Sequence, residues 1–318
     1  MTIPPSTPDS PVERAGTYLR AARAAKVGLA ANFFLSVVKL IGGIWGHSTA
    51  LVADAFESFT DVFTSTGLVW SLRKASEPAD REHPYGHGKI ENIASNVIAG
   101  VLMAVAIGIG IGAWHRIRHA DTLEGPTGLA LVLALFSIVV KEALFQYKLR
   151  VGRKLNSSSL IAEAWHHRSD AFSSLAAALG IGGAIAGGVS WRILDPIAAF
   201  VVALIIGVMA VTIFRRSSLE LMDTQVPADT LEEIRRAAKQ PGVLHVEKVF
   251  ARKSGLDILV DVHLEVDDNM TVLESHRLGH EVERQVMRAV PQVIQVLVHV
   301  EPHQRAEREG RRPIASPH

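Results

Sequence analysis

Cysteine is absent from this sequence of 318 residues. Its absence excludes disulfide bonds and thiolate metal sites together, so any bound metal ion must be held by nitrogen and oxygen atoms. The HExxH motif of zinc peptidases is also missing, and no nucleophile motif stands in its place. We therefore expect that the protein is not an enzyme.

Net charge is almost absent as well. The formal charge is +1 although 20% of the residues are charged, and the mean hydropathy is +0.22, so the charged residues must be concentrated in part of the chain. About 20 consecutive apolar residues are needed for a helix to cross the hydrocarbon core of a bilayer. Six largely apolar segments reach that length, at residues 25–46, 50–72, 92–114, 126–147, 159–187 and 194–214. They predict a six-helix transmembrane domain and exclude an ordinary cytosolic enzyme.

Lysine and arginine are unevenly distributed between the two sets of loops. Cytoplasmic loops of membrane proteins carry an excess of these residues. One set, which includes both chain ends, carries Arg14, Arg20, Arg23, Lys26, Arg73, Lys74, Arg81, Lys89, Lys148, Arg150, Arg153, Lys154, Arg215 and Arg216. The other set carries only Arg116, Arg118 and Arg192. The sequence therefore predicts a multi-pass integral membrane protein with both termini in the cytoplasm.

The chain ends differ in composition from the segments between them. Residues 1–13, MTIPPSTPDSPVE, are rich in proline and serine and lack the basic start and apolar core of a signal peptide. We expect disordered tails at residues 1–21 and 304–318, because both are polar. Between them we expect the six-span membrane domain at 22–216 and a cytoplasmic domain at 217–303.

Residues 217–303 have the periodicity of a small folded domain. The run TLEEIRRAAK is helical in pattern, and HVEKVFARKS and LDILVDVHLEV show the partial alternation of two strands joined at Ser254 and Gly255. A second helical pattern, ESHRLGHEVERQVMRAV, precedes the strand pattern VIQVLVHVEP. This order of helix, strand, strand, helix and strand predicts an α+β domain with its helices on one face of a sheet.

Three carboxylates interrupt the second apolar segment, in the stretch ADAFESFTD at residues 53–61. An acid near the middle of a membrane is costly unless it faces protein, water or a cation, so such residues indicate function. Asp54, Glu57 and Asp61 are spaced i, i+3 and i+7, which places them on one face of a helix. We therefore expect all three to point toward the same site.

The same pattern returns in the fifth apolar segment as AEAWHHRSD, at residues 162–170. Glu57 and Asp61 in one segment, like His166 and Asp170 in the other, are spaced i, i+4. If the two helices pack side by side, three carboxylates and one imidazole meet. That set of ligands suits a tetrahedral divalent cation. The sequence therefore predicts a metal site inside the membrane.

Three other charged residues in the apolar segments need an interpretation. Asp54 and Glu163 each lie one turn from the predicted ligands. They could hydrogen-bond to the ligands, relay protons or line a water-filled vestibule, and purely structural roles stay equally open. Lys141, in the fourth segment, is interpreted as a packed side chain or one that snorkels toward the cytoplasmic end.

Four motifs give the chain a resemblance to the cation diffusion facilitator family of divalent-metal transporters. They are ESFTD at 57–61, HHRSD at 166–170, EPADREHPYGHGK at 77–89 and PGV at 241–243. The resemblance extends over nearly the whole chain outside its tails. It implies a homodimer that exports metal from the cytoplasm in exchange for protons, in a bacterial inner membrane, with a ferredoxin-like fold in the cytoplasmic domain. No nucleic-acid partner is expected.

The resemblance also assigns roles to residues. It implies a transport site at Glu57, Asp61, His166 and Asp170. It implies a loop metal site at Asp80, His83 and His87 and a regulatory metal site at His263, His276, His299 and Glu301. Lys89 and Asp223 match a charge pair that interlocks the dimer. By spacing alone, the imidazoles of the loop suit chelation on a helix, which Pro84 disfavours.

The metal and the coupling ion follow from the ligand types. Zinc is favoured because imidazole and carboxylates in a small tetrahedral site suit it, while iron, cobalt, cadmium and manganese stay open. Metal binding requires deprotonated ligands and so displaces protons, with His166 as the natural titrating group. The alternative function is a membrane metal sensor or scaffold that binds the ion without transporting it.

Overall fold

The computed structural model describes residues 11–75, 77, 79–119, 124–154 and 158–303, without the side chains of 11–25, 68, 69, 72, 158–160, 162 and 163. Within these residues the chain forms two compact units. One contains residues up to 68 and residues 97–214, and the other contains residues 69–96 together with the chain from 215 onward. The expected tail at 304–318 lies outside the described residues.

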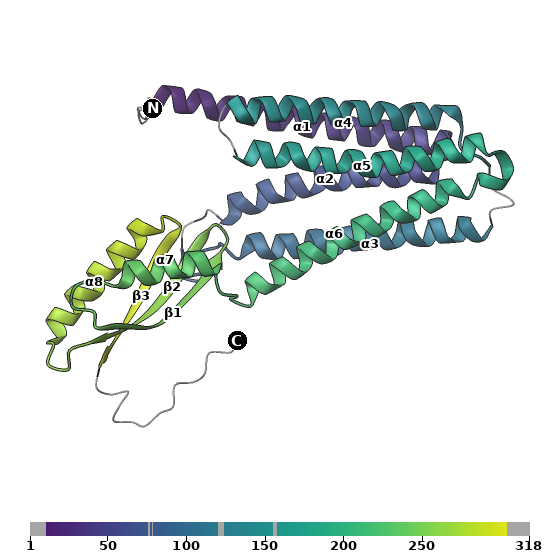
Figure 1. Ribbon diagram of the computed structural model, residues 1–318. Helices are drawn as coiled ribbons and strands as arrows, with labels where there is room; N and C mark the ends of the chain where they lie inside the picture. The colour runs from purple at the N-terminus through teal and green to yellow at the C-terminus, as the bar shows by residue number, and fades with distance from the viewer. Residues whose placement is uncertain (1–10, 76, 78, 120–123, 155–157, 304–318) are drawn as a thin grey trace, which may run out of the picture. The chain divides into compact units, whose positions relative to one another are not determined.

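Six long helices run through the part of the chain that was predicted to be membrane-embedded (Figure 1). They are α1 (Pro11–Trp45), α2 (Thr49–Ala75), α3 (Ile90–Arg118), α4 (Gly128–Lys154), α5 (Ser158–Ala186) and α6 (Leu194–Leu221). Helix α1 begins within the segment expected to be a disordered tail. Proline suits the first position of a helix, and the alanine and arginine that follow favour helix, which fits a start at Pro11.

Five stretches among the described residues are long and apolar enough to cross a membrane. They are Lys26–Trp45, Ile90–Arg118, Gly128–Lys154, Ala164–Ala186 and Gly188–Leu221. Helix α2 is long enough as well, but it carries Asp54, Glu57 and Asp61, which lower its mean hydropathy. The predicted helical membrane domain is confirmed.

Small side chains form much of the contact between the membrane helices. Helix α4 packs along α5 and α1, and a buried cluster between helices consists mainly of alanine: Ala50, Leu51, Ala130, Ala134, Ala177, Ala178, Ile181 and Ala198. Small residues let helix backbones approach closely, which membrane helices need because lipid gives them no hydrophobic drive to associate. Large apolar side chains such as Ile107, Val139 and Leu179 are instead exposed.

A buried carboxylate holds the start of α2. Asp195 of α6 accepts hydrogen bonds from the hydroxyl of Ser48 at 2.6 Å and from the backbone N–H groups of Thr49 at 2.7 Å and Ala50 at 3.3 Å. The first N–H groups of a helix have no partner within the helix, so this carboxylate acts as their cap. The contact fixes the position of the N-terminal end of α2, the helix that carries Asp54, Glu57 and Asp61.

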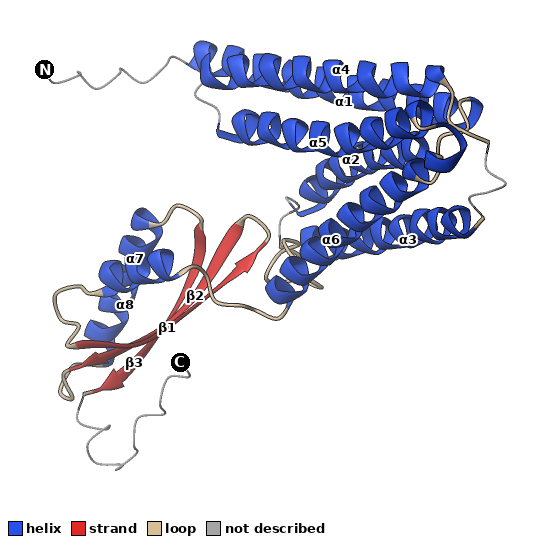
Figure 2. Cartoon of the chain, turned by 45° about the vertical axis from the view of Figure 1, so that its right-hand side comes forward, coloured by secondary structure: helices blue, strands red, loops and turns tan. Residues whose placement is uncertain are grey.

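The second unit contains a sheet with two helices packed on it (Figure 2). Its elements are α7 (Ala228–Ala238), β1 (His245–Ser254), β2 (Asp257–Val266), α8 (Val272–Ala289) and β3 (Val293–Pro302). Strand β2 lies in the centre, antiparallel to β1 and parallel to β3. The predicted order of elements and the turn at Ser254 and Gly255 are confirmed.

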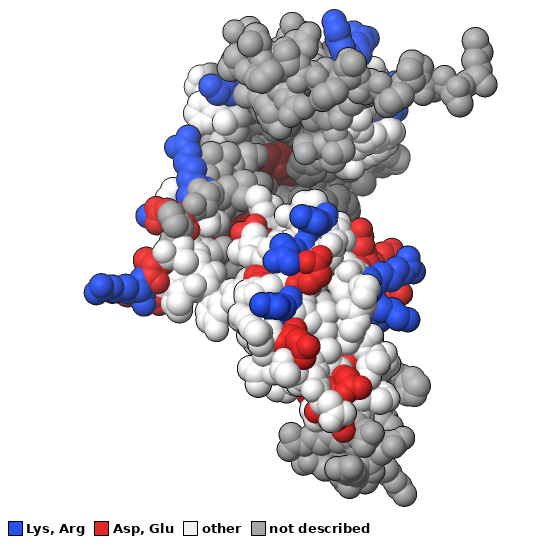
Figure 3. Space-filling view, turned by 90° about the vertical axis from the view of Figure 1, so that its left-hand side faces the viewer, with Lys and Arg blue, Asp and Glu red and all other residues white. Residues whose placement is uncertain are grey.

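The two faces of strand β2 differ in character. Val260, Val262 and Leu264 point into a core shared with α7 and α8. His263 lies between them in sequence and therefore points to the opposite face. Outside this core the unit has a surface of mixed sign, with lysine and arginine interspersed among aspartate and glutamate (Figure 3). Such a surface fits water and contrasts with the apolar exterior of the membrane helices.

The loop between α2 and α3 packs against the turn between β1 and β2. Gly88 lies so close to the carbonyl of Ser254 that a Cβ at position 88 would clash with it. Gly255, with a φ of 66°, lies on the other side of this contact, and its positive φ favours glycine. These contacts explain why residues 69–96 group with the sheet and not with the membrane helices.

Candidate metal sites

Helices α2 and α5 bring Asp61, His166 and Asp170 together. The Nε2 atom of His166 lies 3.8 Å from Oδ1 of Asp61, and its Nδ1 atom lies 3.7 Å from Oδ1 of Asp170. One ligand atom from each residue lies within 4.8 Å of the others. The i, i+4 spacing on α5 places the histidine one turn from its aspartate, and α2 supplies the third ligand. We call these three residues the ligand trio.

The ligand trio has the properties of a cation site. Both carboxylates are buried, and Oδ2 of Asp61 and Oδ2 of Asp170 have no hydrogen-bond partner among the described residues. Buried carboxylate oxygens are costly unless a donor or a cation satisfies them. A tetrahedral ion with bonds of about 2.1 Å separates its ligands by roughly 3.4 Å, close to the distances seen here. His166 is half exposed and lines a cavity of about 210 Å³ with Asp170.

Glu57, the fourth predicted ligand, is beside the trio but is directed elsewhere. It lines the same cavity. However, its Oε2 atom lies 2.5 Å from the hydroxyl of Ser173 and 3.8 Å from Nζ of Lys141. The structure thus groups three of the four predicted ligands, with the fourth carboxylate held by a serine and a lysine.

Asp54 is one turn from Glu57 and is completely buried. One carboxylate oxygen lies 2.8 Å from Nζ of Lys39, and the other accepts a hydrogen bond from Ser174 at 2.7 Å and lies 3.7 Å from Nζ of Lys141. The structure places Asp54 between two lysines and not at the ligand trio. The side chain of Glu163 lies outside the described residues.

The sequence interpretation missed the importance of two lysines. For Lys141, the interpretation as a packed side chain is confirmed and the snorkelling alternative is wrong, because the side chain is fully buried and its Nζ atom donates hydrogen bonds to the Asp170 carbonyl and to Ser174, each at 3.0 Å. Lys39 was not singled out at all, although it too is fully buried. Each lysine interrupts an apolar run, in LSVVKLIGG and SIVVKEALF. That interruption was the available signal, since charges inside membrane helices indicate function.

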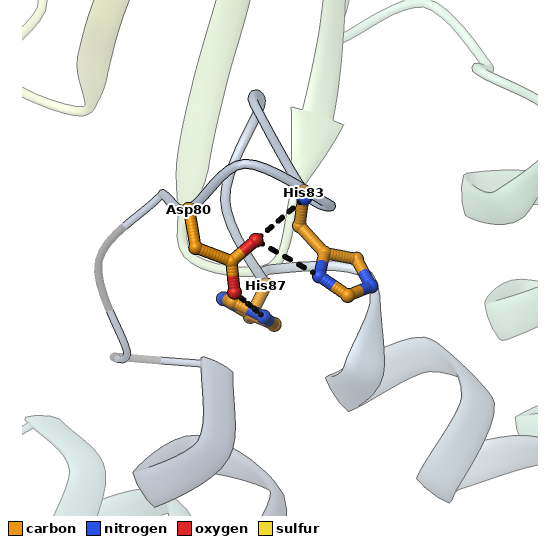
Figure 4. Close-up of side chains that lie close together, drawn as sticks. All are labelled: Asp80, His83 and His87. Carbon is orange, nitrogen blue, oxygen red and sulfur yellow. Dashed lines mark hydrogen bonds and ion pairs between the residues drawn. The ribbon is translucent and has the colours of Figure 1, made fainter.

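A second group of possible ligands lies in the loop between α2 and α3. Figure 4 shows the side chains of Asp80, His83 and His87 directed toward one another. Asp80 accepts hydrogen bonds from the backbone N–H groups of His83 at 2.6 Å and Glu82 at 2.9 Å, and its Oδ2 atom lies 3.5 Å from Nε2 of His87. The N–H of His83 is the main reason that the pKa of Asp80 is lowered. A turn with Gly86 at positive φ, and not a helix, assembles the group.

The third group lies on the face of the sheet opposite the helices. His263 and His299 are paired across β2 and β3. Oε1 of Glu301 lies 2.9 Å from Nδ1 of His263 and 3.3 Å from Nε2 of His299. His276 does not belong to this group, because it lies on α8 with its ring 4.5 Å from that of His280.

The predicted pair of Lys89 and Asp223 is in contact within one chain. Its two charged atoms lie 2.9 Å apart, and Arg252 of β1 lies 3.6 Å from the same carboxylate. The side chains of Lys89 and Asp223 are about half exposed, so their ion pair contributes little free energy by itself. It ties the loop that carries Asp80 to the end of α6.

Two family models match the chain. The cation efflux transmembrane domain matches residues 25–222, and the cytoplasmic domain of cation efflux proteins matches residues 226–303. The first match covers more than half of the chain and includes all six long helices except the start of α1. The second covers the sheet and its two helices.

Several characterised proteins are similar over most of their length. Metal tolerance protein C1 of Arabidopsis thaliana is 38% identical over 87% of this chain, which spans 61% of that protein. Manganese efflux system protein MneP of Bacillus subtilis is 33% identical over 88% of this chain and 96% of its own length. Magnetosome protein MamB of Paramagnetospirillum magneticum is 30% identical over 86% and 91%. The chain therefore belongs to the cation efflux family, the cation diffusion facilitators, which are membrane transporters of divalent metal ions.

Proposed function

We propose that this protein exports a divalent transition-metal ion from the cytoplasm in exchange for protons. The transport site is Asp61, His166 and Asp170, with Glu57 as a fourth ligand that joins when the ion is bound. The observation that carries this proposal is the ligand trio itself, in which two buried carboxylate oxygens have no described hydrogen-bond partner. Buried carboxylate oxygens without a partner are energetically costly, and a bound cation would remove that cost.

Exchange for protons follows from the chemistry of the ligands. A metal ion binds carboxylates and a neutral imidazole, so its arrival displaces any protons that these groups carry. Protons that enter from the other side then displace the metal ion in turn. His166, half exposed and within 4 Å of both aspartates, is placed to take part in this exchange.

The arrangement in the membrane is also part of the proposal. We propose that residues 22–216 form the transport domain and residues 217–303 a cytoplasmic domain, with both termini in the cytoplasm of a bacterial cell. The excess of lysine and arginine in one set of loops supports this orientation. The match to a family of cytoplasmic domains known as ZT_dimer supports a homodimer.

The ligand types favour two metal ions. Zinc suits a small tetrahedral site with an imidazole. Manganese is the second candidate, because three of the four ligands are carboxylates and manganese prefers oxygen. The similarity to a manganese efflux protein of Bacillus subtilis supports it.

Transport assays with the purified protein in liposomes distinguish a metal exporter from a membrane protein that binds metal without transporting it. Uptake of zinc, manganese, iron, cobalt and cadmium is measured with and without a pH gradient. We expect transport of zinc or manganese, with acceleration by an opposing proton gradient, and competition between the two ions at one site. Binding of metal without any flux would instead establish the alternative function, a membrane sensor or scaffold.

We further propose that the two groups outside the membrane bind regulatory metal. One group is Asp80, His83 and His87, and the other is His263, His299 and Glu301. His299→Ala removes one ligand of the second group, and we expect the full-length protein to lose part of its stabilisation by added zinc, since a ligand that binds only the folded state stabilises it.

His276→Ala is the matched control, because this histidine lies on α8 apart from the group. Thermal unfolding with and without zinc measures both variants. Equal loss in the two variants would contradict the assignment of His263, His299 and Glu301 as one site, without affecting the transport site.

A further inference from the structure

A layer of buried charge lies directly beside the ligand trio, built from three helices. It consists of Lys39 of α1, Asp54 of α2 and Lys141 of α4, which we call the charge layer. All three side chains are completely buried. A charge inside a membrane helix bundle is costly and persists only when it is paired. The charge layer therefore needs an explanation that the ligand trio alone does not provide.

The two lysines have different surroundings. Lys39 contacts Asp54 at 2.8 Å and Ser58 at 3.1 Å, and both lie on α2. Lys141 lies between the layer and the ligands, 3.7 Å from Asp54 and 3.8 Å from Glu57. It also donates to the carbonyl of Asp170, a ligand. Lys39 is thus the partner of Asp54, and Lys141 is the cation nearest to the transport site.

The net charge of the charge layer and the transport site together indicates what the layer does. Four buried carboxylates belong to the charge layer and the transport site together: Asp54, Glu57, Asp61 and Asp170. The ammonium groups of Lys39 and Lys141 balance two of them, so these six groups together carry a net charge of minus two when His166 is neutral. Lys148, a third fully buried lysine, contacts His167 at 2.7 Å and is not part of this count. One divalent cation neutralises that charge completely. Without the lysines the same cluster would hold a divalent ion with an excess of negative charge.

We propose that the charge layer sets the affinity of the transport site, and that Lys141 is its positioning residue. Lys141 and Ser173 contact the carboxylate of Glu57, and the positive charge of Lys141 opposes the incoming ion. When the ion binds, Glu57 moves from Lys141 and Ser173 to the metal. Binding is thereby kept weak enough for the ion to leave on the other side. This inference rests on the proposed transport function.

Substitution of the lysine tests the proposal through the sign of its effect. Lys141→Met removes one positive charge near the ion, and we expect metal to bind about tenfold tighter or more while the maximal transport rate falls, because release becomes slow. Zinc and manganese binding to the full-length protein in detergent, and flux in liposomes, measure the two quantities. Damage to the fold would weaken binding, so tighter binding identifies the electrostatic role.

Three further variants keep the test decisive. Lys141→Met with Glu57→Gln restores the net charge, and its affinity should return toward that of the unmodified protein. Glu57→Gln alone should bind more weakly. Lys39→Met removes the same charge farther from Glu57, so we expect a smaller increase in affinity. Lys141→Gln, which retains a donor for the Asp170 carbonyl, serves if the methionine variant does not fold.

The outcomes separate this inference from the proposed function. If the folded lysine variants bind metal as the unmodified protein does, or more weakly, the charge layer does not set affinity and the inference is wrong. The transport site survives that result as long as the removal of Asp61 and Asp170 abolishes flux. If flux persists without these two aspartates, the transport site itself is wrong.

Discussion

A chain that carries Asp61→Asn and Asp170→Asn is expected to lose metal transport almost completely. Asparagine keeps the shape of each side chain but removes both negative charges of the ligand trio. Loss of a charged partner at a buried ion costs about 3–5 kcal/mol, which corresponds to roughly a hundredfold or more in affinity. Metal flux into liposomes and metal binding to the purified protein both measure the effect.

The fold should survive this double substitution. The two carboxylates are close together and buried, so neutral side chains relieve their mutual repulsion in the absence of metal. Thermal unfolding without metal checks this point, and Asp229→Asn, at an exposed position on α7, is the control for a change of the same type. A folded double variant that transports metal at the unmodified rate would exclude the ligand trio as the transport site.

A large loss of stability is expected for Asp54→Asn. Asp54 is the ion-pair partner of Lys39, and it also lies near Lys141. Its neutralisation leaves two buried ammonium groups with Glu57 as their nearest remaining carboxylate. Removal of one partner from a buried ion pair costs about 3–5 kcal/mol, a large fraction of the stability of a folded protein. Thermal or denaturant unfolding of the full-length protein in detergent measures the loss.

The matched variant removes both charges of this pair. Lys39→Met combined with Asp54→Leu replaces the ion pair by apolar side chains, which buried pairs often tolerate at little cost. We expect this double variant to be more stable than Asp54→Asn alone. If both are equally unstable, Asp54 matters through packing or through Ser174 and not through the lysine.

The periodicity of the chain determined its elements. A segment that crosses a membrane must satisfy its own backbone hydrogen bonds, so a long apolar run has to be a helix. Because these segments are helices, residues four apart lie on the same face, and the spacing of His166 and Asp170 on one helix and of Asp61 on another already predicted that all three face one site. The alternation of apolar and polar residues around His263 and around His299 likewise predicted two strands, which pair with each other in the sheet as β2 and β3.

The tertiary structure decided which charges meet. Lys39, Asp54 and Lys141 come from three helices, and their contacts depend on how far each helix is rotated about its axis and shifted along it. Spacing within one helix carries no information on either quantity. The sequence therefore could not predict that Lys141, correctly interpreted as a packed side chain, contacts both Asp54 and Glu57. The helix packing, set by small side chains such as Ala134 and Ala177, gives this glutamate a lysine to contact.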